Sequence, residues 1–164
     1  AGPSAESRRI GEQRKELARR HILRMEFWDG LLKKARQIST LFANISPGKD
    51  HWISTGAGKS GFTWAYVVLK DHARVELYID TADSEKNKHY FDTLLQHKEQ
   101  IEASFGAPLE WQRLDEKRAA RIAYLIHGHG GLPNQENWDA LQDAMIDAMV
   151  RLENALKPHL ARLH

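Results

Sequence analysis

Residues 51–80 read HWISTGAGKSGFTWAYVVLKDHARVELYID, and this stretch decides the fold. Aromatic and β-branched residues fill the runs 62–69 and 73–80, and short turns rich in Gly, Lys and Asp bound them. This pattern is typical of antiparallel strands joined by hairpins. The stretch therefore predicts a three-stranded antiparallel meander.

Alternation along the third strand predicts which of its side chains share a face of the sheet. The two sets are Val75, Leu77 and Ile79 on one face, and Arg74, Glu76 and Tyr78 on the other. We expect the apolar set to face the core. The polar set, with Trp64 or Tyr66 beside it, then either contacts a partner or lies under a helix that makes Tyr78 part of the core.

Helical patterns flank the meander on both sides. The chain is rich in helix formers from Ser4 onward, and from Met25 to about Asn44 an apolar spacing of three and four predicts a core-facing helix. The later elements are expected to be helices at 84–104 and 134–156 and strands at 109–114 and 119–126. The order α-β-β-β-α-β-β-α predicts an α+β fold, with helices packed on a mostly antiparallel sheet of about five strands.

Length and composition limit the class of protein. At 164 residues, the chain is expected to form one α+β domain over residues 25–164, preceded by a basic helical arm or linker over residues 1–24. The absence of cysteine excludes disulfides and thiolate metal ligands. No apolar run approaches the roughly 18 residues that cross a membrane, and we expect a cytoplasmic protein.

Charge is distributed unevenly along the chain. The net charge is +2, yet residues 1–24 contain seven Lys or Arg and three Glu, a net +4. A basic arm on a nearly neutral body indicates contact with polyanions. The alternative interpretation is a solvated helix in which Glu and Arg side chains pair.

Three short motifs suggest chemistry that their context does not support. Gly56–Gly61 resembles a phosphate loop, but Ile53 stands where that motif requires glycine, and a strand follows instead of a helix. Asp115–Lys117 has the residue types of a magnesium-dependent nuclease motif in the right order, yet it lies in a charged turn. His127 and His129 have no third ligand nearby in the sequence. We therefore expect no metal, no cofactor and no catalytic residues.

An ordered set of short motifs resembles one known family. The motifs are Arg24–Trp28, Trp52 with Gly58–Gly61, Val75–Asp80, Asn87 with Phe91, Ile101–Glu102, Leu109–Trp111 and Arg121–Ile122. Their succession is similar to the bacterial domain of unknown function numbered four-two-six-eight, from about Arg20 to the end of the chain. Members of that family often follow a nuclease domain of the PD-(D/E)xK type. The resemblance implies a restriction or phage-defence setting and supplies no catalytic residues.

The leading hypothesis is a non-catalytic recognition module that acts with DNA or RNA, or with a nuclease partner or upstream nuclease domain. The residues expected to contact nucleic acid are basic or aromatic: Arg8, Arg9, Lys15, Arg19, Arg20, Lys59, Arg74 and Tyr78. The alternative is a homodimeric protein-interaction domain whose N-terminal helices pair. A weaker alternative is a nuclease that uses Asp115, Glu116 and Lys117 with Mg²⁺.

Overall fold

The computed structural model describes residues 4–164, which form helices and one five-stranded sheet. The helices are α1 (Ala5–Ala35), α2 (Ser84–Leu95), α3 (Lys98–Phe105), the 3-10 helix η1 (Gln135–Asn137) and α4 (Trp138–Leu160). The strands are β1 (Trp52–Gly56), β2 (Phe62–Val68), β3 (Ala73–Ile79), β4 (Glu110–Gln112) and β5 (Ala120–Ile126). The α+β class and the order α-β-β-β-α-β-β-α are confirmed, with the predicted helix at 84–104 divided into α2 and α3.

The sheet is antiparallel throughout, in the order β1-β2-β3-β5-β4. The predicted meander is therefore confirmed, and β5 pairs with β3 to bring the later strands onto it. Gly58 and Gly61 have φ angles of 82° and 85° in the turn between β1 and β2. Glycine adopts this left-handed region without a Cβ penalty, so the glycine-rich stretch forms a hairpin turn as predicted.

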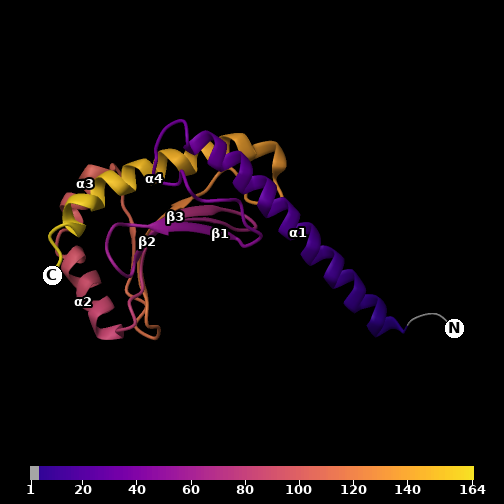
Figure 1. The fold of residues 1–164 in the computed structure, drawn as a ribbon, viewed down its shortest axis with the longest axis horizontal. Coiled ribbons are helices and arrows are strands. Elements are labelled where there is room, and N and C mark those ends of the chain that lie inside the picture. The colour runs from indigo at the N-terminus through magenta and orange to yellow at the C-terminus, as the bar shows by residue number, and fades with distance from the viewer. Residues whose placement is uncertain (1–3) are drawn as a thin grey trace.

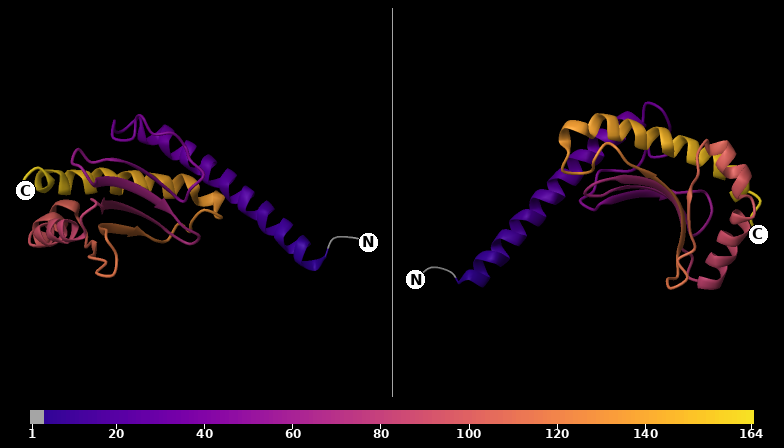
Figure 2. Two further views of the ribbon diagram at one scale, coloured as in Figure 1. Left: turned by 60° about the horizontal axis from the view of Figure 1, so that its bottom comes forward. Right: turned by 180° about the vertical axis from the view of Figure 1, so that it is seen from behind.

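Within the described residues, helices cover one face of the sheet and leave the other open. The sheet curls, α4 lies along its outer side, α1 crosses near α4, and α2 and α3 wrap one end (Figures 1 and 2). Val75, Leu77 and Ile79 point to the covered face and are fully buried. Trp64 and Tyr66 lie opposite Leu77 and Val75, on this same face. The expectation that they neighbour Arg74 and Tyr78 is wrong, because β2 presents its aromatic side to the core.

Helix α1 is continuous from the arm into the domain. Ser4 caps it by accepting a hydrogen bond from the Ser7 amide. Its buried residues begin at Phe27, and the part before them extends away from the body (Figure 1). The helix ends at Ala35, earlier than the predicted Asn44. Ser39 Oγ accepts from the Leu41 amide, an alternative to the helical hydrogen bond.

Two buried polar side chains of α2 fasten it to the loops at one end of the sheet. Asn87 Nδ2 donates to the carbonyls of Thr81 and Arg118, and its Oδ1 accepts from the Thr81 amide and hydroxyl. Lys88 Nζ donates to the carbonyls of Arg113, Leu114 and Ala119 at 2.5 to 2.8 Å. The carbonyls of Arg113 and Leu114 accept hydrogen bonds from Lys88 instead of pairing with a neighbouring strand. β4 is therefore shorter than the predicted strand at 109–114 and ends at Gln112.

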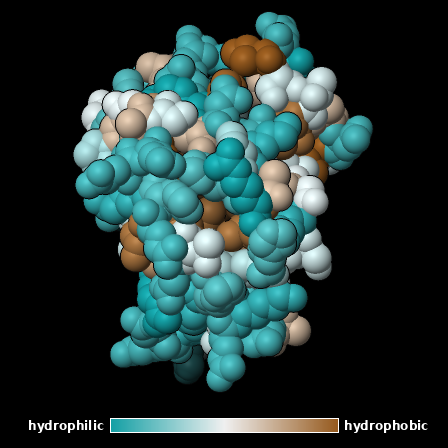
Figure 3. Space-filling model, turned by 90° about the vertical axis from the view of Figure 1, so that its left-hand side faces the viewer, coloured by the Kyte–Doolittle hydropathy of each residue, from teal (hydrophilic) through white to brown (hydrophobic). Residues whose placement is uncertain are grey.

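The end of the molecule formed by α2, α3 and the C-terminus is mostly hydrophilic, with apolar atoms in small separate patches (Figure 3). Large exposed apolar patches mark partner surfaces more often than scattered side chains do. Because the apolar patches at this end are small and separate, we interpret it as ordinary solvated surface. None of the helices within residues 4–164 has the length and apolar character needed to cross a membrane.

Candidate functional site

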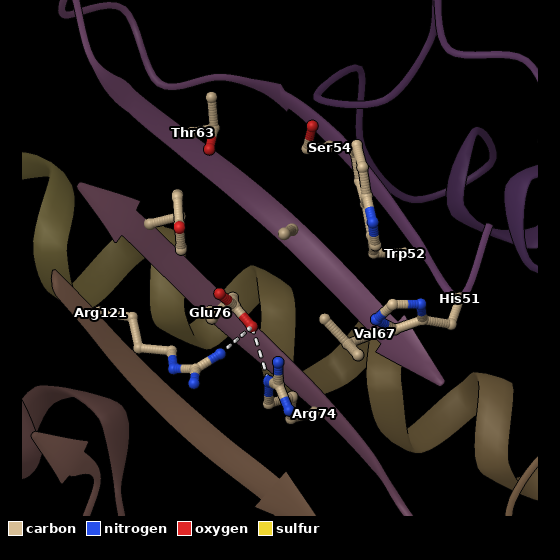
Figure 4. A pocket seen from close by; sticks show the side chains of 10 residues that line it. His51, Trp52, Ser54, Thr63, Val67, Arg74, Glu76 and Arg121 are labelled. Carbon is tan, nitrogen blue, oxygen red and sulfur yellow. Dashed lines mark hydrogen bonds and ion pairs between the residues drawn. The ribbon is translucent and has the colours of Figure 1, made fainter. Parts of the chain in front are cut away.

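The uncovered face of the sheet holds a groove of about 370 Å³, lined by residues of β1, β2, β3 and β5 and by His51 (Figure 4). Alternation places Arg74, Glu76 and Tyr78 of β3 on this face, as predicted. Strand pairing sets Tyr78 between Thr63 and Arg121. The open question of what covers this face is answered: no helix in the described part of the chain lies over it, and Tyr78 is only half-buried.

The groove is hollow because its centre carries small side chains. Ser54 pairs with Ala65, and Ala65 pairs with Glu76. Longer side chains rise around this floor, among them Trp52, which is 46% exposed at the rim. A large exposed tryptophan beside polar groups is typical of a binding surface.

Glu76 lies at the bottom of the groove and is only 3% exposed. Its Oε1 accepts a hydrogen bond of 2.6 Å from Arg74 Nε, and Arg121 Nη1 forms an ion pair with the same oxygen at 3.8 Å (Figure 4). Arg121 is held in turn, because its Nε donates to Gln112 Oε1. Glu76 Oε2 accepts no hydrogen bond from residues 4–164, which leaves it available to a ligand.

The groove is basic overall. Arg74 and Arg121 outnumber Glu76 among the charged groups that line it. Burial lowers the pKa of His51, and the positive charges of Arg24 and Arg74 lower it further against the opposing effect of Asp50 and Glu76. The ordinary pKa of histidine already lies below 7, so the neutral form of His51 predominates at pH 7 in the free protein.

A second cavity, of about 670 Å³, separates α1 from the end of β2. Arg19, Arg20 and Arg24 line it from α1, and Lys70 lines it from the turn after β2. His51 lines both cavities, so the groove continues toward the basic side of α1. Arg24 Nε is buried without a partner among the described residues, and burial together with Arg20 lowers the pKa of Arg24.

The predicted contact residues fall into four places. Arg74 and Tyr78 line the groove, and Arg19 and Arg20 line the second cavity. The remaining arm residues lie exposed on the free part of α1: Arg8, Arg9 and Lys15. Lys59 lies elsewhere, with Nζ 3.5 Å from the Leu163 carbonyl oxygen and 5.2 Å from the centre of the Tyr90 ring.

The sequence analysis missed several residues of the groove. Trp52 and Ser54 could have been found, because they flank buried Ile53 in the alternation of β1. Arg121 and Gln112 could not, because their place depends on the pairing of β5 with β3 and β4. Glu76 was placed on the right face, but its contact with two arginines needed the register.

The motifs set aside in the sequence lie apart from the groove. Asp115 pairs with Arg113 in an exposed turn, and Arg113 also pairs with Asp92. The His127 ring stacks on His72, with 5.2 Å between ring centres, and His72 contacts Asp71. Within residues 4–164, no group of three or more His, Cys, Asp or Glu side chains is arranged to hold a metal ion.

The fold and the groove define a small α+β domain, and over residues 4–164 helices cover one face of its antiparallel sheet and leave the other open. The chain belongs to the family described as Domain of unknown function (DUF4268), which matches residues 23–160. The groove lies within the matched residues, whereas Arg8, Lys15 and Arg19 of α1 precede them. No curated protein and no solved structure is significantly similar to the chain.

Proposed function

We propose that the chain is a nucleic-acid recognition module, which binds through the groove and the adjoining basic side of α1. The observation that carries the proposal is the open sheet face, where Arg74 and Arg121 flank one carboxylate and His51 leads on to Arg19 and Arg20. Arginine suits phosphate because its planar guanidinium donates two parallel hydrogen bonds. Aromatic and basic side chains together are typical of nucleic-acid surfaces.

The basic residues of α1 extend this surface beyond the sheet. At about 100° per residue, Arg8, Lys15 and Arg19 fall within roughly 40° of one another around the helix axis. All three are exposed, as is Glu12 beside them, so this stripe carries three positive charges and one negative charge and runs outward from the second cavity. A strand of nucleic acid that leaves the groove past His51 would meet this stripe.

Salt dependence tests the proposal directly, by fluorescence anisotropy of labelled single-stranded and duplex oligonucleotides titrated with the full chain. Four phosphate contacts to a single strand would weaken binding roughly 50-fold between about 50 and 200 mM salt. The double variant Arg19→Ala/Arg20→Ala removes two exposed charges beside the second cavity. It should lower the slope of log affinity against log salt by about 1.4.

The matched control is Lys157→Ala/Arg162→Ala, which removes the same charge from exposed positions near the C-terminus. That end of the molecule lies far from the free part of α1 (Figure 1). The control should bind as the unchanged protein does. Absence of binding at low salt, or equal loss in both double variants, would contradict the proposal.

The proposal extends to a setting beside a nuclease. The family resemblance implies restriction or phage-defence surroundings, in which a module without its own cleavage activity would hold the target for a nuclease partner or a linked nuclease domain. Affinity that comes mainly from phosphates carries little sequence preference. A partner domain would then limit where cleavage occurs.

A homodimer is the second candidate function, because α1 exposes apolar side chains on its free part. Ile10 and Leu17 are 42% and 45% exposed and lie seven residues apart, on one side of the helix. A dimer that pairs these helices would persist at high salt, whereas nucleic-acid binding would weaken. Sedimentation velocity at low and high salt separates the two candidates.

A further inference from the structure

We propose that the groove holds an unpaired base of a single strand, and that Glu76 selects a base with an amino group at the position of cytosine N4. This inference rests on the proposed function and adds to it the kind of nucleic acid and the feature of the base that is recognised. It begins from the free oxygen of Glu76 at the bottom of the groove. A carboxylate oxygen only accepts hydrogen bonds, so this site favours a ligand with an N–H group.

The shape of the groove favours an unpaired base over a duplex. Its volume of about 370 Å³ is in the range of pockets that enclose a small organic group. The hydrogen-bonding edge of a paired base is occupied by its partner strand, whereas a single strand can turn its bases outward. The base edge could then reach Glu76 at the floor, between the two arginines.

Two aromatic residues supply flat surfaces above the floor. Trp52 is half-exposed at the rim on β1 (Figure 4). Tyr78 lines the groove from β3. Base stacking on such side chains tolerates any base, because every base has a π face. Stacking would therefore supply affinity, and the choice among bases is left to Glu76.

The arginines hold the carboxylate in place and face the phosphates. Arg74 Nε and Arg121 Nη1 both approach Oε1, so Oε2 is the atom left to meet the base. Cytosine presents an amino group at N4, whereas uracil presents a carbonyl oxygen at the same place. A carboxylate accepts from the amino group and repels the carbonyl oxygen, and uracil can offer its N3–H to Oε2 only by turning within the groove. Cytosine should therefore bind more tightly than uracil.

Oligo-dC and oligo-dU of about 10 nucleotides are the probes, because their bases differ only at the atoms that pair. Binding is measured by anisotropy at mildly alkaline pH, where oligo-dC stays unfolded. The unchanged protein should prefer dC to dU by at least about fivefold, which is the lower end of discrimination by one good base contact. Duplex of mixed sequence should bind more weakly than oligo-dC.

The variant Glu76→Gln tests the assignment of the selecting atom. Glutamine both accepts and donates, so it can give an N–H to the uracil carbonyl, and the preference for dC should shrink or reverse. The control is Glu110→Gln, which removes the same charge from an exposed residue of β4 that lies on the same face outside the groove. It should keep the preference of the unchanged protein.

The outcomes separate this inference from the proposed function. Salt-sensitive binding with equal affinity for dC and dU overturns the inference and leaves the proposed function standing. No binding to any oligonucleotide overturns both. If Glu76→Gln fails to fold, the preference of the unchanged protein still decides, because equal binding of dC and dU is enough to reject selection for an amino group.

Discussion

Two polar clusters, one at the loops at one end of the sheet and one on its open face, differ in whether their hydrogen bonds are complete. At α2, Asn87 and Lys88 are buried, and each side chain is surrounded by partners from the chain itself. In the groove, Glu76 is equally buried, yet one of its oxygens has no partner within residues 4–164. The first cluster is closed, and the second opens to solvent.

The difference separates polar groups that build the fold from polar groups that are left for a ligand. A buried polar group without a partner costs free energy. The closed cluster avoids that cost by bonding to backbone carbonyls of the loop before β5. In the groove, the two arginines satisfy Oε1 of Glu76, and Oε2 meets solvent. We infer that the closed cluster serves stability and that the groove serves binding.

Replacement of the closed cluster should have the largest effect on stability. Lys88→Met leaves the carbonyls of Arg113, Leu114 and Ala119 without their shared donor, and should lower the free energy of unfolding by about 3 kcal/mol. Urea denaturation followed by circular dichroism measures this change. Lys86→Met, on an exposed position of the same helix, should change it by less than about 0.5 kcal/mol. Equal small effects of both variants would remove the distinction between the clusters.

Loss of the rim tryptophan should affect binding and leave stability nearly unchanged. Trp52→Ala removes a stacking surface and should weaken single-strand binding about tenfold. Trp52→Phe keeps a flat ring and should lose less. Anisotropy measures both, and thermal unfolding checks that the variants remain folded. Full affinity in Trp52→Ala would show that bases do not stack at the rim.

The order of elements could be predicted because each pattern is local. Alternation in residues 73–79 and apolar spacing in residues 138–156 are visible in short windows, and neighbouring strands form the meander. The break between α2 and α3 could not, because it depends on what each helix packs against: α2 contacts β3 and β5, whereas α3 packs on α4. The end of α1 was misplaced for a similar reason, since apolar spacing continues past Ala35.

Only some of the residues of the groove could be predicted from the sequence. Arg74 and Tyr78 follow from alternation within β3, and Arg19 and Arg20 follow from the charge of the arm. The two sets meet only because His51 lies between them in three dimensions. Arg121 joins Glu76 through the pairing of β5 with β3, which brings together residues more than 40 positions apart. Local sequence does not specify that pairing.

Replacement of the open carboxylate should cost less stability than replacement of the closed lysine. Glu76→Gln keeps an oxygen that can accept from Arg74 and loses only the charge, so we expect a loss of about 1 kcal/mol in the free energy of unfolding. The comparison uses the same urea denaturation as Lys88→Met. A loss as large as that of Lys88→Met would mean that the groove cluster is also structural.

The smallest effect expected is a pH dependence of binding at His51. Burial and the charges of Arg24 and Arg74 hold the pKa of His51 below its usual value in the free protein, and a bound phosphate would raise it. Binding would then take up a proton, so affinity should rise two- to threefold as pH falls through about 6.5, and His51→Gln should abolish this rise.

The stability of the free protein should instead fall as pH falls. The unfolded chain protonates more readily than folded His51, so the free energy of unfolding falls over the same pH range. Affinity and the free energy of unfolding should therefore change in opposite directions with pH. Loss of both changes in His51→Gln would assign them to this residue, and an unchanged pH profile in the variant would exclude it.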